Sequence, residues 1–315
     1  MTRLPLMLWL LLGAAVACKN LSSPPPPPPP PPPLPARSVF PADNAWNRDI
    51  SADSVDPHSD SLIAHCGGSV SLHPDFGTVY QGAPWGIPFI AVTGSQRRVP
   101  VSFTYDDESD PGPYPIPPDA PIEGGPSSTD DRHVLVIDVD NWTLYELFDA
   151  HPVNGGASWT AGSGAIFDLA SNALRPDGWT SADAAGLPIF PGLVRYDEVA
   201  AGQIAHALRF TCPVTRRAYV PPARHFASTQ SDSFLPPMGM RVRLKASVDI
   251  SGFPVDVQVI LSGLKKYGMM VADNGGAFFV TGAPDPRWND LNIDTMKRLH
   301  GTDFEVVRMT GLVVR

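Results

Sequence analysis

The chain has 315 residues, of which 32 are acidic and 23 are basic, so its formal net charge is −9. A protein that binds nucleic acid through phosphate contacts needs concentrated lysine and arginine, so this balance excludes nucleic acid as an expected partner. For the same reason it makes an anionic polysaccharide a less favoured partner than a neutral one.

Residues 1–18 have the features of a secretory signal peptide. Arg3 precedes an apolar run from Leu4 to Leu12, which is short for a membrane span, and small residues follow. The sequence Ala15-Val16-Ala17-Cys18 resembles the lipobox of bacterial lipoproteins, so we expect Cys18 to carry a lipid. This predicts a protein anchored in the cell envelope, in the outer membrane if the host is Gram-negative. The alternative is an ordinary signal peptide and a secreted product.

Residues 19–37 form a proline-rich tether. The ten prolines from Pro24 to Pro33 are expected to make a stiff polyproline II rod of roughly 30 Å. Residues 38–315 contain no second low-complexity segment, and their length suits a single globular domain with a large core.

The cysteines bear on disulfides and metals. Besides Cys18 the chain has Cys66 and Cys212, and an oxidising compartment allows one disulfide between them, although spacing alone leaves their pairing open. No CxxC or Cys/His ligand spacing is present, so no metal site is expected. No cofactor is expected either, because no GxGxxG or phosphate-binding loop follows a strand.

The apolar patterns predict a mainly β or α+β domain, with antiparallel sheets in a sandwich- or barrel-like arrangement and a few short helices. Three hairpins are expected, namely 87–93 with 99–105, 134–139 with 143–148, and 269–272 with 278–281. Helices are expected over 60–65, 197–210, 254–267 and about 290–300, and a final strand over 304–307.

Two acidic regions lie among the predicted strands. Residues 106–131, rich in proline, glycine and acids, must form a long ordered loop, which either lines a site or is a solvated flap. Asp138, Asp140 and Asn141 fit the turn of the second hairpin, with calcium binding as the alternative. Glu146 and Asp149 alternate with apolar residues, so one of them is a candidate to face a cleft.

The candidate catalytic residues begin in the stretch from Trp159 to Phe210. Asp168 lies on a strand expected to be buried, where a charge needs a partner. Asp183 is explained as a helix-start acid or as a catalytic carboxylate. On the predicted helix over 197–210, His206 and Arg209 are neighbours three residues apart, and Glu198 lies two turns earlier.

Further candidates lie beyond that stretch. Arg224 and His225 follow a proline pair, so we expect them at a strand end or loop, where exposed polar groups often act in catalysis. Residues 240–246 alternate apolar and basic side chains, which places Arg241, Arg243 and Lys245 on one face of a strand. That face either binds an anionic or hydroxylated ligand or is the solvated side of a sheet.

The segment from Val39 to Val307 resembles an uncharacterised family of secreted bacterial proteins. The resemblance rests on distinctive strings that include PADNAWN, DESDPGPYPIPPDAPIEGG, GWTSADAAGLPIFPGLVRYDEV, HALRFT and PPMGMRVRLKAS. It implies one continuous secreted domain, and it transfers no activity and no catalytic residue.

Three functions are compatible with these residues. The first is a glycan hydrolase in which Asp168, Asp183 or Glu198 supply the acid and the nucleophile or base, with Trp159, Trp179 and Tyr196 stacking on sugars. The second is a polysaccharide lyase in which Arg209 or Arg224 neutralises a uronate and His225 or Tyr267 removes the proton. The third is a non-catalytic surface protein that binds glycan or another envelope component.

Overall fold

The computed structural model describes residues 32–35 and 37–315. The predicted signal peptide, Cys18 and nearly all of the polyproline run therefore lie outside the described residues. Residues 31–315 group into a single compact unit by their contacts. No helix within the described ranges has the length and apolar character needed to cross a membrane.

The larger of the two main sheets is mixed and has six strands. It contains two parallel and three antiparallel pairs, and strands distant in sequence become neighbours. In spatial order the strands are β1 (His73–Asp75), β15 (Phe279–Thr281), β11 (Leu208–Cys212), β14 (Met269–Asn274), β13 (Arg241–Leu244) and β16 (Phe304–Val306).

A second group of strands is formed by residues 89–168. Its four-stranded sheet has the order β10 (Ser163–Asp168), β7 (Thr143–Phe148), β6 (Val134–Asp138) and β4 (Phe89–Val92). A three-stranded sheet has the order β5 (Val101–Phe103), β9 (Ser158–Ala161) and β8 (His151–Val153). Two short pairs complete the strands, β12 (Ala218–Tyr219) with β17 (Val313–Val314) and β2 (Val79–Tyr80) with β3 (Ala83–Pro84). The predicted mainly β class is confirmed.

The helices are few and short. They are α1 (Ser59–Cys66), α2 (Tyr196–Ala200), α3 (Val255–Lys266) and α4 (Asp290–Asp294), with 3₁₀ turns η1 (Asp106–Glu108), η2 (Phe190–Gly192), η3 (Thr295–Arg298) and η4 (Gly301–Asp303). The predicted helix α3 is confirmed, and it buries Val257, Ile260, Leu261 and Leu264 while packing on β13. It ends before Gly268, whose φ of +66° is a conformation that glycine adopts without steric cost.

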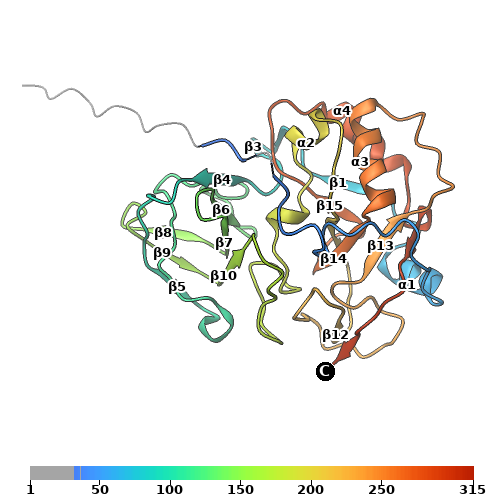
Figure 1. The fold of residues 1–315 in the computed structure, drawn as a ribbon, viewed down its shortest axis with the longest axis horizontal. Helices are drawn as coiled ribbons and strands as arrows, with labels where there is room; N and C mark the ends of the chain where they lie inside the picture. Colours follow the sequence, from blue (N-terminus) through green and yellow to red (C-terminus); the bar gives the residue numbers. More distant parts are fainter. Residues whose placement is uncertain (1–31, 36) are drawn as a thin grey trace, which may run out of the picture. The chain divides into compact units, whose positions relative to one another are not determined.

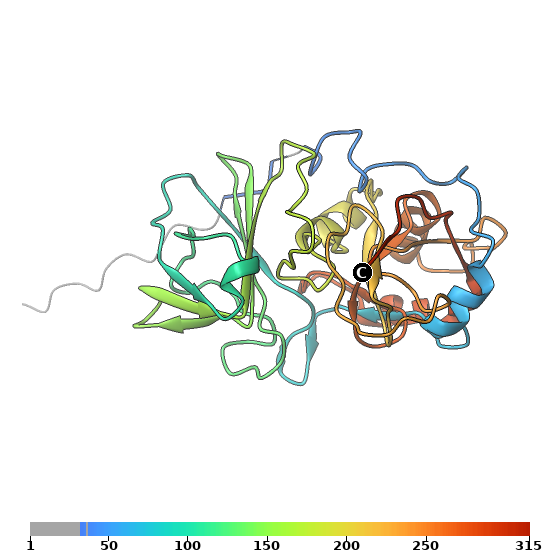
Figure 2. The same ribbon diagram turned by 90° about the horizontal axis from the view of Figure 1, so that it is seen from below.

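Both faces of the four-stranded sheet are covered. Val134 and Val136 pack in a small core with Tyr114 and Trp159, whereas Leu135 and Ile137 join the large core that continues to the six-stranded sheet. This explains why β6 is an unbroken apolar run instead of an alternating one. In both views the strands β4–β10 lie to one side and the six-stranded sheet to the other, with residues 170–190 between them (Figures 1 and 2).

A disulfide joins Cys66 at the end of α1 to Cys212 at the end of β11. Both residues are fully buried. The question that the spacing left open is thus answered, and the bond fixes an N-terminal helix to a central strand.

The second predicted hairpin, β6 with β7, is confirmed with the turn at residues 139–142. The other two hairpins are wrong. β4 pairs with β6 and β5 pairs with β9, both in parallel, so the first predicted pair is divided between two sheets. β14 and β15 are separated by β11, which inserts between them. Adjacent apolar runs predict strands, but only the tertiary core selects their partners.

The predicted helix over 197–210 is correct at its start and wrong beyond Ala200. α2 stops at Ala200, Gly202 takes a φ of +84°, and the chain re-enters a sheet as β11. Apolar residues at helical spacing and acids at its start favoured a helix, but Gly202 ends it and the buried β-sheet position overrides the local propensity. As a result, Arg209 lies on a strand.

The arginines of β13 do not form a solvated face. Arg241 donates to the carbonyls of Ala45 and Tyr267, at 2.7 and 2.8 Å. Arg243 is buried and donates to Glu305 at 2.8 Å. Both guanidinium groups also donate to backbone carbonyls of residues 45–50 and so attach this segment to β13. The alternation in sequence does not reveal this role.

Candidate functional site

One face of the six-stranded sheet carries a band of polar side chains. The register aligns Asp75, Thr281 and Arg209 across β1, β15 and β11. The next row contains Thr211 opposite Asp273, after an irregularity between Phe210 and Thr211. Phe210 and Val280, which alternate with these residues, are fully buried in the core behind the sheet.

The loop between Thr180 and Gly186 brings a carboxylate onto this polar face. Asp183 is 1% exposed, and its Oδ2 lies 3.2 and 3.1 Å from Nε and Nη2 of Arg209. Its other oxygen accepts the backbone N–H of Ala185 at 3.1 Å. Arg209 also donates from Nη1 to the hydroxyl of Thr281 at 2.8 Å. A buried charge pair with these additional hydrogen bonds holds both side chains in one geometry.

Glu123 and His133 approach from the other group of strands. Glu123 belongs to the long acidic loop, and His133 immediately precedes β6. Nδ1 of His133 lies 2.6 Å from Oε2 of Glu123, and Nε2 lies 3.0 Å from the carbonyl of Ala182. Both ring nitrogens face acceptors, which is the arrangement that a charged imidazolium satisfies.

The pKa values of this pair follow from its burial and its charges. Burial alone lowers the pKa of His133, but the charge and hydrogen bond of Glu123 outweigh it and raise the pKa to about 9. Burial alone raises the pKa of Glu123, but His133 outweighs it and leaves the pKa below its ordinary value. Near neutral pH the pair is therefore Glu⁻ and His⁺.

Asp273 differs from its neighbours in protonation. Burial, reinforced by the negative charge of Asp183, raises the pKa of Asp273 to about 7. Burial also raises the pKa of Asp183, but Arg209 lies in direct contact with that carboxylate. Within the described part of the chain Asp273 has no ion-pair partner, so it is the carboxyl that retains a proton near neutral pH.

The fourth acid, Asp75, leads to a group of aromatic rings. It accepts the indole N–H of Trp85 at 3.1 Å, and burial raises its pKa. His73 stacks on Phe279 with the ring centroids 4.0 Å apart, and Trp85 lies 5.5 Å from the exposed ring of Tyr80. We call Asp75, Glu123, Asp183 and Asp273 the carboxylate cluster, and His73, Tyr80, Trp85 and Phe279 the aromatic shelf.

The structure brings together two of the sequence-predicted catalytic residues, Asp183 and Arg209. The reading of Asp183 as a helix-start acid is wrong, because residues 181–186 are bends and turns and its carboxylate is buried.

Glu198 and His206 form a separate group with Arg195. Oε1 of Glu198 lies 2.6 Å from Nη2 of Arg195, and Oε2 lies 3.1 Å from Nε2 of His206. Burial raises the pKa of Glu198, but these two neighbours outweigh it and lower the pKa to about 2. Arg195 also donates to the carbonyl of Phe190 at 2.7 Å, so this group ties α2 to η2.

Arg224 and His225 form a third group, at the loop position that was predicted. Arg224 contacts Asp177 at 3.2 Å, and His225 lies 2.8 Å from the carbonyl of Ala184 and 3.8 Å from Glu108. His225 thus touches the loop that carries Asp183, at Ala184, whereas His133 contacts the same loop at Ala182. Tyr267, the alternative lyase base, is buried beyond the end of α3.

Asp168 stands apart from all three groups. It is exposed at the end of β10 and accepts the backbone N–H of Ala170 at 2.9 Å, so the expected buried charge is wrong. A residue at the last position of a strand lies next to a turn, where a carboxylate caps the backbone.

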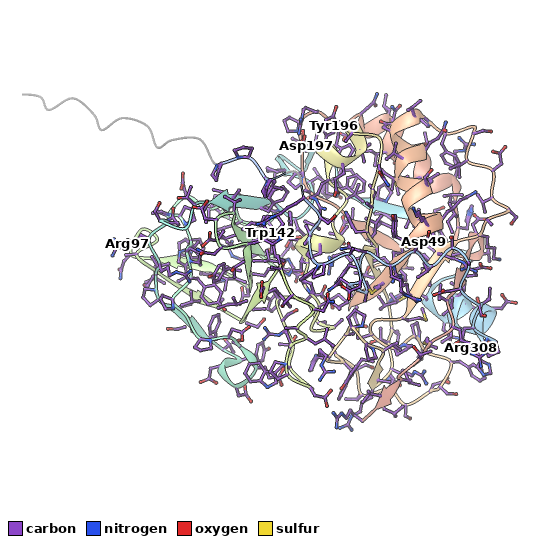
Figure 3. The ribbon with its side chains drawn as sticks, in the orientation of Figure 1. Asp49, Arg97, Trp142, Tyr196, Asp197 and Arg308 are labelled. Carbon is purple, nitrogen blue, oxygen red and sulfur yellow. A yellow bond between two sulfur atoms is a disulfide. The ribbon has the colours of Figure 1, made fainter. Side chains whose placement is uncertain are left out.

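The three predicted sugar-stacking residues differ in accessibility. Trp159 is 1% exposed in the small core, so its ring cannot contact a ligand. Trp179 is half-buried near the guanidinium of Arg175, 5.6 Å from it. Tyr196 is half-buried at the start of α2 beside exposed Asp197 (Figure 3) and packs edge-on against Trp288.

Six residues of the site were not predicted from the sequence, namely Asp75, Glu123, His133, His73, Tyr80 and Phe279. Asp273 lies in the connection of the predicted hairpin of 269–272 with 278–281. Two signals were present. The long acidic loop was recognised as a candidate to line a site, and it supplies Glu123. Asp273 follows directly after the apolar run of β14, at a strand end.

The structure also shows where Glu146 and Asp138 lie. Glu146 does not face a cleft, because it is fully buried and accepts the backbone N–H groups of Ile189 and Phe190 at 2.9 Å. Burial raises its pKa to about 7. Asp138 accepts backbone N–H groups of Asp140 and Asn141, as turn chemistry predicts. In the described ranges no group of three or more His, Cys, Asp or Glu side chains is placed to hold a metal ion.

No family model, curated protein or solved structure matches the chain.

Proposed function

We propose that the protein is an extracellular carbohydrate hydrolase whose active site is the carboxylate cluster beside the aromatic shelf. The observation that carries this proposal is that Glu123 is paired with His133 at 2.6 Å, whereas Asp273 has no ion-pair partner among the described residues. The pKa of Asp273 is raised to about 7, whereas His133 holds the pKa of Glu123 low. Glycoside hydrolysis needs one protonated and one ionised carboxyl group at the same pH.

Each residue has a defined role in this reaction. Protonated Asp273 donates its proton to the glycosidic oxygen as the bond to the anomeric carbon breaks. The Glu123 carboxylate stabilises the positive charge that develops on the sugar, or takes the proton from the attacking water. Both bonds from His133 reach Oε2 of Glu123, which leaves Oε1 for this role. The products are a new reducing end and a free hydroxyl group.

Arg209 and Asp183 are positioning residues in this proposal. Their buried pair fixes the electrostatic field at Asp273, because Asp183 raises and Arg209 lowers the pKa of that carboxyl. The aromatic shelf offers ring faces on which sugars stack, with His73, Trp85 and Phe279 half-buried and Tyr80 exposed.

The proposal includes attachment to the cell envelope through a lipid on Cys18. It rests on the sequence of residues 1–35, in which a signal-like segment, a lipobox-like cysteine and a stiff proline rod occur in that order. The rod would hold the folded unit away from the membrane surface.

The test is turnover of a panel of neutral and acidic polysaccharides by the purified protein and by D273N and E123Q. We expect the parent protein to hydrolyse at least one of these polysaccharides. Each variant should do so about 10²- to 10⁴-fold more slowly, which is the usual contribution of a general acid or base. Activity of the parent should decline as pH rises above about 7, because Asp273 then loses its proton. It should also decline in acid as Glu123 becomes protonated.

D168N is the matched control, because Asp168 is an exposed turn carboxylate at the end of β10 in the four-stranded sheet, whereas Asp75 and Asp273 lie in the six-stranded sheet. It should retain full activity. Unsaturated products that absorb in the ultraviolet would indicate a lyase instead. Retention on a glycan column without turnover would indicate the non-catalytic binding protein, and either result would overturn the hydrolase assignment.

A further inference from the structure

Two adjacent cavities lie away from the carboxylate cluster. Their volumes are about 440 and 410 Å³, and both are bordered by Arg308 and Met309. The first cavity reaches the polar end of β13 at Arg241, and the second reaches the start of α1 near His58. Because they share two lining residues, we treat them as one feature, the arginine groove.

The groove is positively charged in a chain whose net charge is −9. Arg48, Arg241 and Arg308 line the first cavity, and Arg216 joins Arg308 in the second. One aspartate lines each cavity. Asp53 is paired with Arg48 at 2.6 Å, and Asp56 accepts the backbone N–H groups of His58 and Met309 at 2.9 and 3.3 Å. The two linings therefore contain four guanidinium groups and only two carboxylates, and both carboxylates already accept hydrogen bonds from the protein.

Arg241 and Arg216 are the cations of the groove whose charged form is opposed by burial. Arg241 donates to the backbone carbonyls of Ala45, Arg48 and Tyr267, and its pKa is lowered to about 9 by burial and by the charge of Arg48. It stays charged at neutral pH. Burial also lowers the pKa of Arg216, whose buried Nε has no hydrogen-bond partner among the described residues. A bound anion would supply the missing counter-charge.

Apolar side chains make up a further part of the lining and suit the C–H faces of sugars. Val220, Pro221 and Met270 line the first cavity, and Leu62 and Phe234 line the second. Phe234 is 42% exposed and packs edge-on against His58, at 5.8 Å between ring centroids. An exposed aromatic ring beside guanidinium groups is the combination that binds a carboxylated sugar, through stacking and charge-assisted hydrogen bonds.

We propose that the arginine groove is a non-catalytic binding site for a chain of carboxylate-bearing sugars, that is, a polyuronate segment. In this proposal Arg308, which lines both cavities, binds carboxylates of the ligand on either side. Arg241 and Arg48 bind ligand carboxylates in the first cavity, and Arg216 does so in the second. The site goes beyond the proposed hydrolysis and does not depend on the carboxylate cluster being catalytic.

The experiment is isothermal titration of the purified full chain with hexagalacturonate, and with maltohexaose as the neutral oligosaccharide. We expect R308Q to weaken hexagalacturonate binding at least tenfold, in line with the loss of charge-assisted hydrogen bonds. Arg308 is exposed, so this substitution leaves the core intact. R216Q should weaken binding to a lesser extent, and added salt should weaken it further.

R97Q is the matched control, because Arg97 is an exposed arginine remote from Arg308 (Figure 3). It should bind like the parent protein, and so should D273N, which separates this site from the proposed active site. The inference is overturned if the parent does not bind hexagalacturonate or binds maltohexaose equally tightly. It is also overturned if R97Q loses as much affinity as R308Q, or if a sulfated hexasaccharide binds and the uronate does not.

Discussion

The buried pair of His133 and Glu123 should make folding stability depend on pH above neutrality. The folded-state pKa of His133 is about 9, compared with 6.5 for an unperturbed histidine. The charged imidazolium therefore contributes stability that is fully present below pH 6.5 and is lost as pH rises through about 9. The difference between these two pKa values corresponds to about 3 kcal/mol. The same interaction lowers the pKa of Glu123, so this energy is counted once.

The measurement is urea-induced unfolding, followed by tryptophan fluorescence at pH 6, 8 and 10. In the parent protein the unfolding free energy should fall by about 3 kcal/mol more than in H133Q between pH 6 and pH 10. Roughly half of that excess should already be lost at pH 8. E123Q should show the same flattened profile, because it removes the charge that raises the pKa of His133.

H151Q is the control for this experiment. His151 lies 2.7 Å from Asp149, but both side chains are about half exposed to solvent, so their pairing is screened. Its pH profile should follow that of the parent protein. Parallel profiles for the parent and H133Q would refute the reasoning, since they would mean that the imidazolium is not stabilised by the fold.

The remaining predictions concern the disulfide between Cys66 and Cys212 and the lipid anchor expected on Cys18. C66A/C212A should unfold at lower denaturant, with a loss of up to about 5 kcal/mol, because the bond closes a loop of 146 residues. Guanidinium titrations of the parent and the variant measure this, and equal midpoints would contradict it. C18A should move the protein from the membrane fraction to the soluble fraction of the producing cell. Fractionation followed by immunoblotting tests this, and an unchanged membrane fraction would exclude Cys18 as the anchor.

Local features of the fold were predictable where the sequence carries its own boundary signals. The helix α3 has an apolar face, a proline before it and Gly268 after it, and the β6–β7 hairpin has two apolar runs around a polar turn. Both are as the patterns predicted. Such signals act within a few residues and do not need knowledge of the partners.

Strand pairing was not predictable in the same way. β11 inserts between β14 and β15, and it is this insertion that places Arg209 between Thr281 and the β14 strand carrying Asp273. The partners of β11 are more than 50 residues away in sequence, and the local pattern around Arg209 resembled a helix. Because the neighbours of Arg209 in the site follow from this strand pairing, they could not be predicted without it.

The carboxylate cluster was predictable only in part for a second reason. Asp183 was recognised as a candidate, but Asp273 and Glu123 each had an ordinary explanation in a turn and in a loop. What distinguishes them is the pKa contrast, which arises from burial and from the nearby charges of Asp183 and His133. Burial is a property of the assembled core and has no signature in the composition of a loop.

The loop over residues 180–186 is held from both groups of strands. The carbonyls of Ala182 and Ala184 accept from His133 and His225, and the N–H of Ala185 donates to the carbonyl of Ala272 in β14. An added or deleted residue in this loop would break these hydrogen bonds and separate Asp183 from Arg209. Although it has no regular secondary structure, this connection is therefore as constrained in length as a strand, and we expect variation in length to fall in other loops.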